Sequence, residues 1–497
     1  MNPNHLMPKT PADADPRRWI VLFILLLASF MNLIDVTIVN TALPSMQEAF
    51  GATSSQIEWV VAAYVLAFAL GLLPFGRLGD IVGRRKMFLI GVTGFTIASA
   101  LCGLAPSIET LIAARVLQGF AGAVMTPQVL AIVQVIFPPQ EKGAAFSLFG
   151  LSAGLAAVTG PIAGGLLITA DLWGLDWRPI FLVNIPLGIL AVVAGLTLIA
   201  KMPGNPALRN DYVGISIFGA TILLLIFPLI EGRGYGWPAW AFVMLGLSVI
   251  GMVAFYLWEK RRDRAGAPQL LPVALLENRN FLLGTTMTMI FFSGVPGLFM
   301  ILAIFFQGGF GLTALESGLT TIPFPLGVLL ASLISGRLGS RFLSWRVAIG
   351  SLLLAGGMIV LRFTLAGVTD SIDHWAFVPG LLVAGIGLGI GISGLFQTIL
   401  AGVPGRDAGS GAGALQAFQQ VGGALGVALV GEIFFTWLEH ARDWGATSMH
   451  NAFVNAATNA TTYEIAAFLL VAAMVPFLKR PPHTQPVYGQ PPTVAEV

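Results

Sequence analysis

GRLGDIVGRRK, residues Gly76–Lys86, lies between two long apolar segments and combines glycines, one acid and four bases. Its glycines permit a tight turn and close helix approach, and Asp80 adds nothing to a loop that serves only to orient the chain. The first four residues, Gly76–Gly79, recur as Gly336–Gly339, an offset of 260 residues. Each copy follows the second apolar segment of a set of six. The chain therefore contains two related sets of helices, a pattern typical of parallel repeats that rock against each other.

The composition around this motif is that of a protein in lipid. Of the 497 residues, 56% are hydrophobic and only 10% are charged, whereas soluble domains carry about 25% charged residues. A net charge of +2 gives no indication of nucleic acid as a partner. The single cysteine, Cys102, excludes an intramolecular disulfide and a cysteine-built metal centre. Since no membrane segment carries a histidine cluster, we expect neither a metal nor a cofactor.

Fourteen apolar segments approach the roughly 20 residues that cross a bilayer core. The first is too long for a cleavable signal. The expected fold is all-α and integral to the membrane, with two six-helix bundles and two inserted helices. The spans are 19–43, 57–76, 87–105, 109–131, 143–169, 179–200, 211–231, 239–258, 281–306, 317–336, 347–366, 376–403, 409–437 and 463–478. The expected units are an N-terminal tail (1–18), a first bundle (19–200), inserted helices with a connector (201–280), a second bundle (281–478) and a disordered tail (479–497).

Basic residues orient these spans, because Lys and Arg concentrate on the cytoplasmic side. With the N-terminus inside, 21 of the 26 Lys and Arg are cytoplasmic. Only Arg178, Arg233 and Arg442 lie outside, and Arg115 and Arg362 lie within spans. We therefore predict an inner-membrane protein with both termini in the cytoplasm.

Two ionisable residues lie deep in the first set of spans. Asp35 is 16 residues beyond Trp19, which is about 24 Å along a helix. A charge there costs at least ~2.5 kcal/mol and usually marks an ion pathway. Arg115 has a similar depth in the fourth span and should face the bundle interior. The alternatives are a structural Asp that caps backbone and an arginine that snorkels outward.

The fifth span is rich in glycine at three- and four-residue spacing, which allows close helix packing. Pro161 should kink it. Packing alone explains such a run in many membrane proteins. The residues are Gly150, Gly154, Gly160, Pro161, Gly164 and Gly165.

GRLGDIVGRRK resembles the loop between helices 2 and 3 that marks the major facilitator superfamily. The resemblance implies a conformational switch in the first copy, with Asp80 near the start of span 13, at 409–413. In the second, GRLGSRFLSWR, Ser340 replaces Asp80 and Leu343 replaces Gly83, which implies a mainly structural role. The implied switch residues are Gly76, Arg77, Gly79, Asp80, Gly83, Arg84, Arg85 and Lys86.

Further segments are similar to the fourteen-helix drug:proton antiporters of the EmrB/QacA type. They are LIDVTIVNTALP around Asp35, RVLQGFAGAVMTP around Arg115, the glycine run of span 5, WRPIFLVNIPLG, and AGSGAGALQAFQQVGGALGVAL in span 13. The resemblance implies proton-coupled export of lipophilic or cationic compounds by alternating access. It also implies proton coupling through Asp35 and Arg115. Glu432, late in span 13, is the alternative site.

A cavity between the bundles should be apolar with few polar groups, because Met- and Phe-rich walls accept varied lipophilic shapes. For each such residue, ordinary packing is an equal alternative. The candidates are Gln118, Met287, Met289, Phe291, Phe292, Phe299, Met300, Phe396 and Gln397.

Other functions are weakly supported. The glycines of span 12 lie inside one apolar helix and lack the strand and turn of a nucleotide site. Without a triad pattern or a soluble domain, an enzyme or sensor is not expected. Export of one dedicated metabolite stays open, as does a periplasmic adaptor partner. Arg362 is expected to snorkel outward, and Glu231 to lie at an interface.

Overall fold

The computed structural model describes residues 15–171, 174–205, 208–338, 343–441 and 448–478, and these residues form helices without a strand. Both expected tails lie almost wholly outside the described residues, as does Gly339 of the second motif copy. The α-helices are α1 (Arg18–Phe50), α2 (Ser54–Val82), α3 (Arg84–Gly103), α4 (Ile108–Ile136), α5 (Lys142–Thr169), α6 (Pro179–Leu182), α7 (Asn184–Leu198), α8 (Tyr212–Glu231), α9 (Ala239–Arg264), α10 (Val273–Leu276), α11 (Arg279–Ala303), α12 (Ala314–Thr321), α13 (Pro323–Leu338), α14 (Leu343–Ala366), α15 (Val378–Ala401), α16 (Ala408–Glu439) and α17 (Met449–Met474).

The predicted membrane-spanning helices are confirmed. In the described part of the chain, thirteen helices are long and apolar enough to cross a bilayer. The remaining predicted span, 317–336, is present as α12 and α13, divided at Ile322. Pro323 starts α13 and cannot donate the hydrogen bond that would continue α12.

The predicted start of the last span, residue 463, is wrong. The helix α17 begins at Met449, where Ser448 caps it by accepting from the Asn451 amide at 3.2 Å. The segment 449–462 is rich in Asn and Thr, which lowers its apparent hydropathy. Its apolar side chains, among them Phe453, Val454 and Ala457, are nevertheless buried. Glu464 therefore lies in the middle of a span and not at its end.

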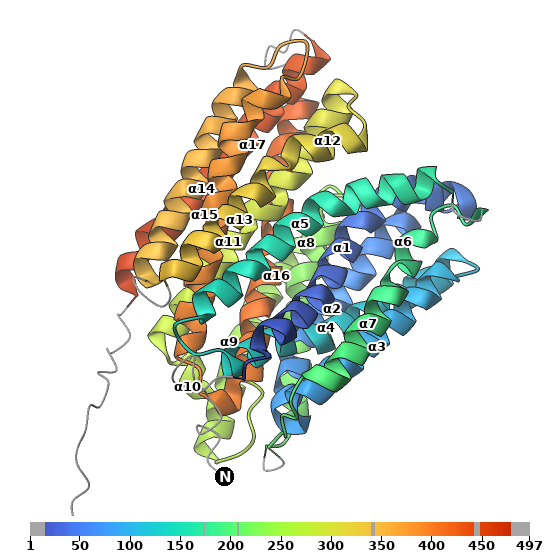
Figure 1. Cartoon of the computed structure of the whole chain (residues 1–497). Helices are drawn as coiled ribbons and strands as arrows, with labels where there is room; N and C mark the ends of the chain where they lie inside the picture. Colours follow the sequence, from blue (N-terminus) through green and yellow to red (C-terminus); the bar gives the residue numbers. More distant parts are fainter. Residues whose placement is uncertain (1–14, 172–173, 206–207, 339–342, 442–447, 479–497) are drawn as a thin grey trace, which may run out of the picture.

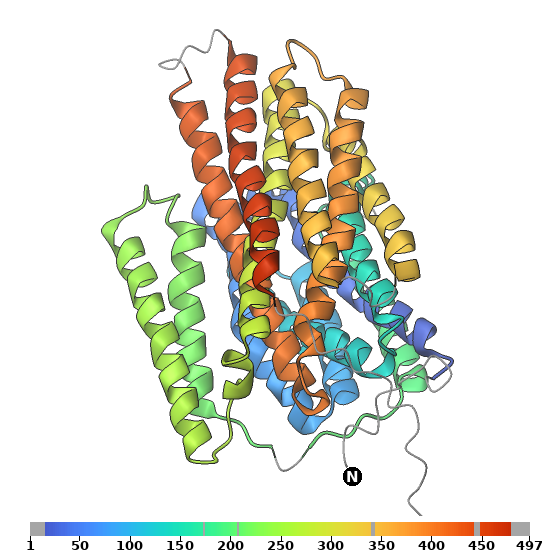
Figure 2. The ribbon, with the colours of Figure 1, turned by 90° about the vertical axis from the view of Figure 1, so that its left-hand side faces the viewer.

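The helices fall into two sets around α5 (Figure 1). We call α1–α7 the N-terminal half and α11–α17 the C-terminal half. The α8–α9 pair stands beside them as a separate antiparallel hairpin (Figure 2). Its outward side chains, such as Phe242, Val249 and Ile250, are more than half exposed, as expected for a surface in hydrocarbon.

The glycines of α5 explain how it packs against both halves. A Cβ at Gly160 would lie 1.9 Å from Thr37 Oγ1 of α1, so only glycine permits this approach. One to two turns earlier, a Cβ at Gly154 would contact Pro325 of α13 at 3.4 Å. The helix therefore touches α1 through one pair of glycines and the C-terminal half through another.

Candidate functional site

The acid and the base predicted inside the membrane form an ion pair. Arg115 Nη1 of α4 lies 2.5 Å from Asp35 Oδ2 of α1. Both residues are 0% exposed. Arg115 also donates from Nε to the Val60 carbonyl of α2 at 2.9 Å. The guanidinium therefore joins three helices, and it does not snorkel.

A set of uncharged side chains completes the shell of Asp35. Gln118, one turn after Arg115, donates to Asp35 Oδ1 at 2.7 Å and accepts from Arg115 Nη1 at 2.6 Å. Gln118 also donates to Ser99 Oγ of α3 at 2.8 Å, and Asn184 of α7 donates to Asp35 Oδ1 at 3.4 Å. The Asp35 carboxylate thus accepts hydrogen bonds from side chains of α4 and α7. We call Asp35, Arg115, Gln118, Ser99 and Asn184 the buried polar network.

An aromatic side chain lies against the network. The Tyr64 ring centroid is 4.2 Å from Arg115 Cζ, a cation–π distance. The Tyr64 hydroxyl accepts from Asn32 Nδ2 at 2.6 Å. Sequence reasoning missed Asn32, Tyr64, Ser99 and Asn184. A signal existed, since each is a polar residue inside an otherwise apolar span.

The acid of the GRLGDIVGRRK motif makes a second set of buried contacts. Asp80 Oδ1 accepts from the Gly409 amide at 2.9 Å, and Oδ2 accepts from the Ser410 amide at 2.9 Å. These amides lie in the first turn of α16, where a helix favours a negative charge. Arg84 donates to Asp80 Oδ1 at 2.8 Å and to the Gly405 carbonyl at 2.5 Å. The expected contact between Asp80 and the start of span 13 is therefore present.

The same end of the molecule holds further bonds between the halves. Arg77 Nη1 lies 3.3 Å from Asp407 Oδ1, and both side chains are buried. Gln134 of α4 donates to the Leu400 carbonyl of α15 at 2.7 Å. We call the contacts of Asp80, Arg84, Arg77, Asp407 and Gln134 the interhalf contacts. They close the end at which α1 begins.

Glycine is required where the motif packs. A Cβ at Gly76 would lie 2.5 Å from the Gly409 carbonyl, and one at Gly79 would lie 2.0 Å from Gln128 Oε1. Gly83 has φ 112°, which side chains rarely adopt. Arg85 donates to the Leu196 carbonyl at 2.5 Å, away from α16, and Lys86 is exposed. Arg84 therefore contacts Asp80, whereas Arg85 bonds to α7.

The predicted cavity residues of α11 and α15 are packed together in the C-terminal half. The rings of Phe292 and Phe396 stack with centroids 6.4 Å apart, and Phe146 of α5 meets Phe396 at 6.1 Å. Met287 and Phe291 are also buried, and Phe299 is half-buried. These aromatic rings join the halves.

Gln397 belongs to a small polar cluster that sequence reasoning did not find. It donates from Nε2 to Ser393 Oγ at 3.1 Å, and Arg346 Nη2 of α14 donates to the same oxygen at 2.6 Å. Ser393 in turn donates to the Gly143 carbonyl of α5 at 2.9 Å. The cluster is therefore a further bond between the halves.

The remaining candidates lie apart from the buried polar network. Glu432 is 3.3 Å from Arg233 and accepts from Trp237 Nε1 at 2.9 Å, and its side chain is 44% exposed. The expectation that Arg362 snorkels outward is wrong. It donates to the Thr458 carbonyl and, at 2.7 Å, to Thr462 Oγ1 of α17, because that carbonyl offers a partner inside the bundle.

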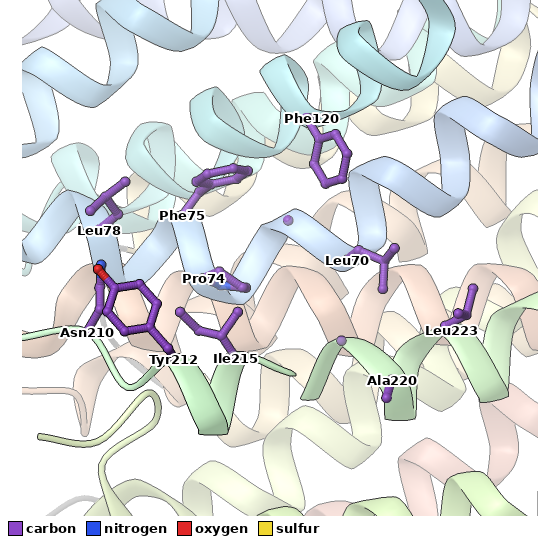
Figure 3. Close-up of a pocket in the computed structure, with 12 residues that line it drawn as sticks. Leu70, Pro74, Phe75, Leu78, Phe120, Asn210, Tyr212, Ile215, Ala220 and Leu223 are labelled. Carbon is purple, nitrogen blue, oxygen red and sulfur yellow. The ribbon is translucent and has the colours of Figure 1, made fainter. Parts of the chain in front are cut away.

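A groove of about 470 Å³ runs between α2, α4 and α8. Its walls are apolar except at the end near Asn210 and Tyr212. None of the predicted cavity residues lines it. Figure 3 shows the side chains that border it, among them Leu70, Pro74, Phe75, Phe120, Ile215 and Leu223.

Acids, histidines and cysteine in the described ranges do not gather in groups of three that could hold a metal ion.

The chain resembles known proteins over most of its length. The family model described as Major Facilitator Superfamily matches residues 25–211 and 205–427. A "Probable actinorhodin transporter" of Streptomyces coelicolor is 40% identical over 87% of this chain and 77% of its own length. The "Multidrug resistance protein Stp" of Mycobacterium tuberculosis is 32% identical over 83% of this chain and 75% of its own. The proton:xylose symporter XylE shares the fold, with a TM-score of 0.64 at 13% identity, over 93% of this chain and 96% of its own.

Proposed function

Because the chain belongs to the major facilitator superfamily, a family of multi-pass membrane transporters, we propose that it exports lipophilic or cationic compounds in exchange for protons. The names of its relatives, an actinorhodin transporter and a multidrug resistance protein, support the substrate class. The ion pair between Asp35 and Arg115 supports the proton coupling.

The orientation that we propose follows the basic residues and places both termini in the cytoplasm of the inner membrane. The interhalf contacts then lie at the cytoplasmic end, and the described conformation is closed toward the cytoplasm. Residues 19–200 and 281–478 rock against each other as two bundles. The α8–α9 pair and its connector, 201–280, lie outside this movement.

In the proposed cycle, Asp35 takes up a proton from the outer side and leaves its ion pair with Arg115. The neutral acid no longer holds the guanidinium, and the bundles are free to rearrange. When the proton leaves on the cytoplasmic side, the carboxylate can pair again. One substrate leaves the cell as the proton enters.

The free energy of one proton crossing the membrane is large enough to sustain a steep substrate gradient. A unit charge crossing 100 mV contributes about 2.3 kcal/mol, and one pH unit adds about 1.4 kcal/mol. Together these sustain a substrate ratio of several hundredfold per proton.

The observation that carries this proposal is the complete burial of the Asp35–Arg115 pair. The test uses everted vesicles with a preformed pH gradient. Substrate should dissipate the gradient with the natural chain and not with Asp35→Asn, whose amide keeps the volume and removes the charge. Unchanged proton release in Asp35→Asn would exclude Asp35 as the coupling residue. Glu439→Gln, at an exposed acid, serves as the control, and Glu432 would then be the next candidate for the coupling residue.

The range of compounds that the transporter accepts needs a separate test. The packed Phe and Met side chains of α11 and α15 suit varied lipophilic shapes. Susceptibility of a pump-deficient host, with and without the chain, to a panel of unrelated compounds distinguishes a multidrug exporter from one with a dedicated substrate. A periplasmic adaptor is a further expectation that copurification from crosslinked membranes tests.

A further inference from the structure

Glu464 is an acid in the middle of α17 that the proposed cycle does not use. It is 0% exposed, and neither carboxylate oxygen has a hydrogen-bond partner among the described residues. Thr461, Phe468 and Val471, which share its face of the helix, are also buried. Glu464 therefore points into the C-terminal half and away from lipid.

Its position along the membrane matches that of the buried polar network. α7 and α17 are the last helices of their halves, and the repeated motif relates these halves. Asn184, which donates to Asp35, lies 14 residues before the end of its span at Leu198. Glu464 lies 13 residues before the end of its span at Phe477. At 1.5 Å per residue the two depths agree within about 2 Å.

The charged groups on α14 and α16, which pack around α17, make their contacts with groups other than Glu464. On α14, Arg362 donates to Thr458 and Thr462, and Arg346 donates to Ser393. On α16, Glu432 and Glu439 pair with Arg233. The other titratable groups are Arg279 at the cytoplasmic start of α11, His450 at the outer end of α17, and Tyr463, which donates to Ser293 at 2.8 Å.

An ionised carboxylate in these surroundings would be buried without a counter-charge, which costs several kcal/mol. The neutral acid, which keeps its proton, is the form that this packing accommodates. Asp35 differs because its charge is paired. The two halves thus hold acids at one depth, one with a counter-charge and one without.

We propose that Glu464 is a second proton-binding site of the transporter, in the C-terminal half, which keeps its proton in this conformation and releases it when α11 moves. The proposal rests on the proton-coupled function above. α11 packs directly on the Glu464 face, since a Cβ at Gly294 would lie 2.4 Å from Phe468. Pro296 interrupts the α11 hydrogen bonds just beyond the Ser293–Tyr463 pair.

The proton balance is simple. The carboxyl O–H transfers its proton to water that reaches the site when α11 bends, and the carboxylate is reprotonated from the other side of the membrane. A cycle that uses both acids moves one more proton per substrate than Asp35 alone.

The test measures proton stoichiometry for purified full-length protein in liposomes, from the substrate ratio that balances an imposed potential. Glu464→Gln should still transport. It should lower the sustainable ratio by about 50-fold at 100 mV, which corresponds to the ~2.3 kcal/mol carried by one proton. An unchanged ratio would overturn the proposal. Glu439→Gln, which replaces an exposed acid paired with Arg233, is the matched control and should leave the ratio unchanged.

A second measurement decides the case if Glu464→Gln does not transport. Substrate-induced infrared difference spectra of the natural protein should show loss of a protonated-carboxyl band, and this loss should be absent in Glu464→Gln. Persistence of the loss in Glu464→Gln would assign it to another acid and refute the site. Asp35→Asn separates the two proposals. If substrate no longer moves protons across the membrane in this variant but still causes the loss of the Glu464 carboxyl band, both proposals are supported. Coupling that survives Asp35→Asn contradicts only the assignment of Asp35.

Discussion

Asp80→Asn tests whether the interhalf contacts hold closed the end of the molecule that we propose to be cytoplasmic. Asp80 accepts from two amides of α16 and from Arg84, at 2.8–2.9 Å. An asparagine keeps one acceptor oxygen and turns an NH₂ group toward an amide donor. Hydrogen bonds to a charged group contribute about 1.5–3 kcal/mol each. We take ~3 kcal/mol as the net loss of the free energy that favours the closed state. This corresponds to a shift of the equilibrium by about 100-fold toward the state that is open to the cytoplasm.

The assay is maleimide labelling of Leu400→Cys from the cytoplasmic side. Leu400 is 1% exposed, and its carbonyl accepts from Gln134 across the interface between the halves. The natural Cys102 is 0% exposed, so it contributes little background. Labelling should be much faster when Asp80→Asn is added, and efflux should fall while the amount of protein in the membrane is retained.

Asp211→Asn is the matched control. Asp211 is also buried and also caps a helix, through the Gly214 amide at 3.1 Å, but it lies in the α8–α9 pair. It should leave the labelling rate unchanged. Equal labelling with and without Asp80→Asn would refute the reasoning, because the carboxylate would then contribute nothing to closure.

Three further tests have definite expected outcomes. Arg115→Lys should lower gradient-driven efflux by about tenfold or more, because lysine cannot make the planar contacts of the guanidinium and loses ~1.5 kcal/mol or more; a normal transport rate would contradict this. Gly160→Val should destabilise the protein by about 1–3 kcal/mol in thermal unfolding, because its Cβ would overlap Thr37, whereas Gly165→Val, with open space around it, should not. Ala220→Trp fills the groove beside α8 and should leave the efflux rate unchanged; a fall beyond about tenfold, ~1.4 kcal/mol, would place the groove on the substrate path.

The sequence predicted the helices well because apolar length is a strong signal, and it predicted the contact of Asp80 because the motif is distinctive. It failed at the start of α17. There the Asn and Thr side chains of 449–462 lower the mean hydropathy of the segment, although Phe453, Val454 and Ala457 are buried in the bundle. Hydropathy alone cannot register this burial. Glu464 was overlooked for the same reason, since a helix starting at residue 463 would have left it at the interface.

The sequence also identified Asp35 and Arg115 without their partners. Charged residues inside a span are conspicuous, whereas Ser99 and Asn184 resemble the many polar residues that bond their own helix. Only the crossing of α1, α3, α4 and α7 shows that Asn184 donates to the Asp35 carboxylate and that Ser99 accepts from Gln118 and Asn184 beside it.

The proposed proton site and the proposed switch are connected through α4. Near the end that we propose to be the outer one, Arg115 of α4 donates to the Val60 carbonyl of α2 at 2.9 Å. Toward the other end, Gln128 of α4 donates to the Phe75 carbonyl of α2 at 2.9 Å, one turn before Asp80. Tied at two levels, α2 and α4 have little freedom to slide past each other. We infer that a change of charge at Asp35 reaches Asp80 by moving both helices together against α16, which is a rocking movement and not a local rearrangement of the loop.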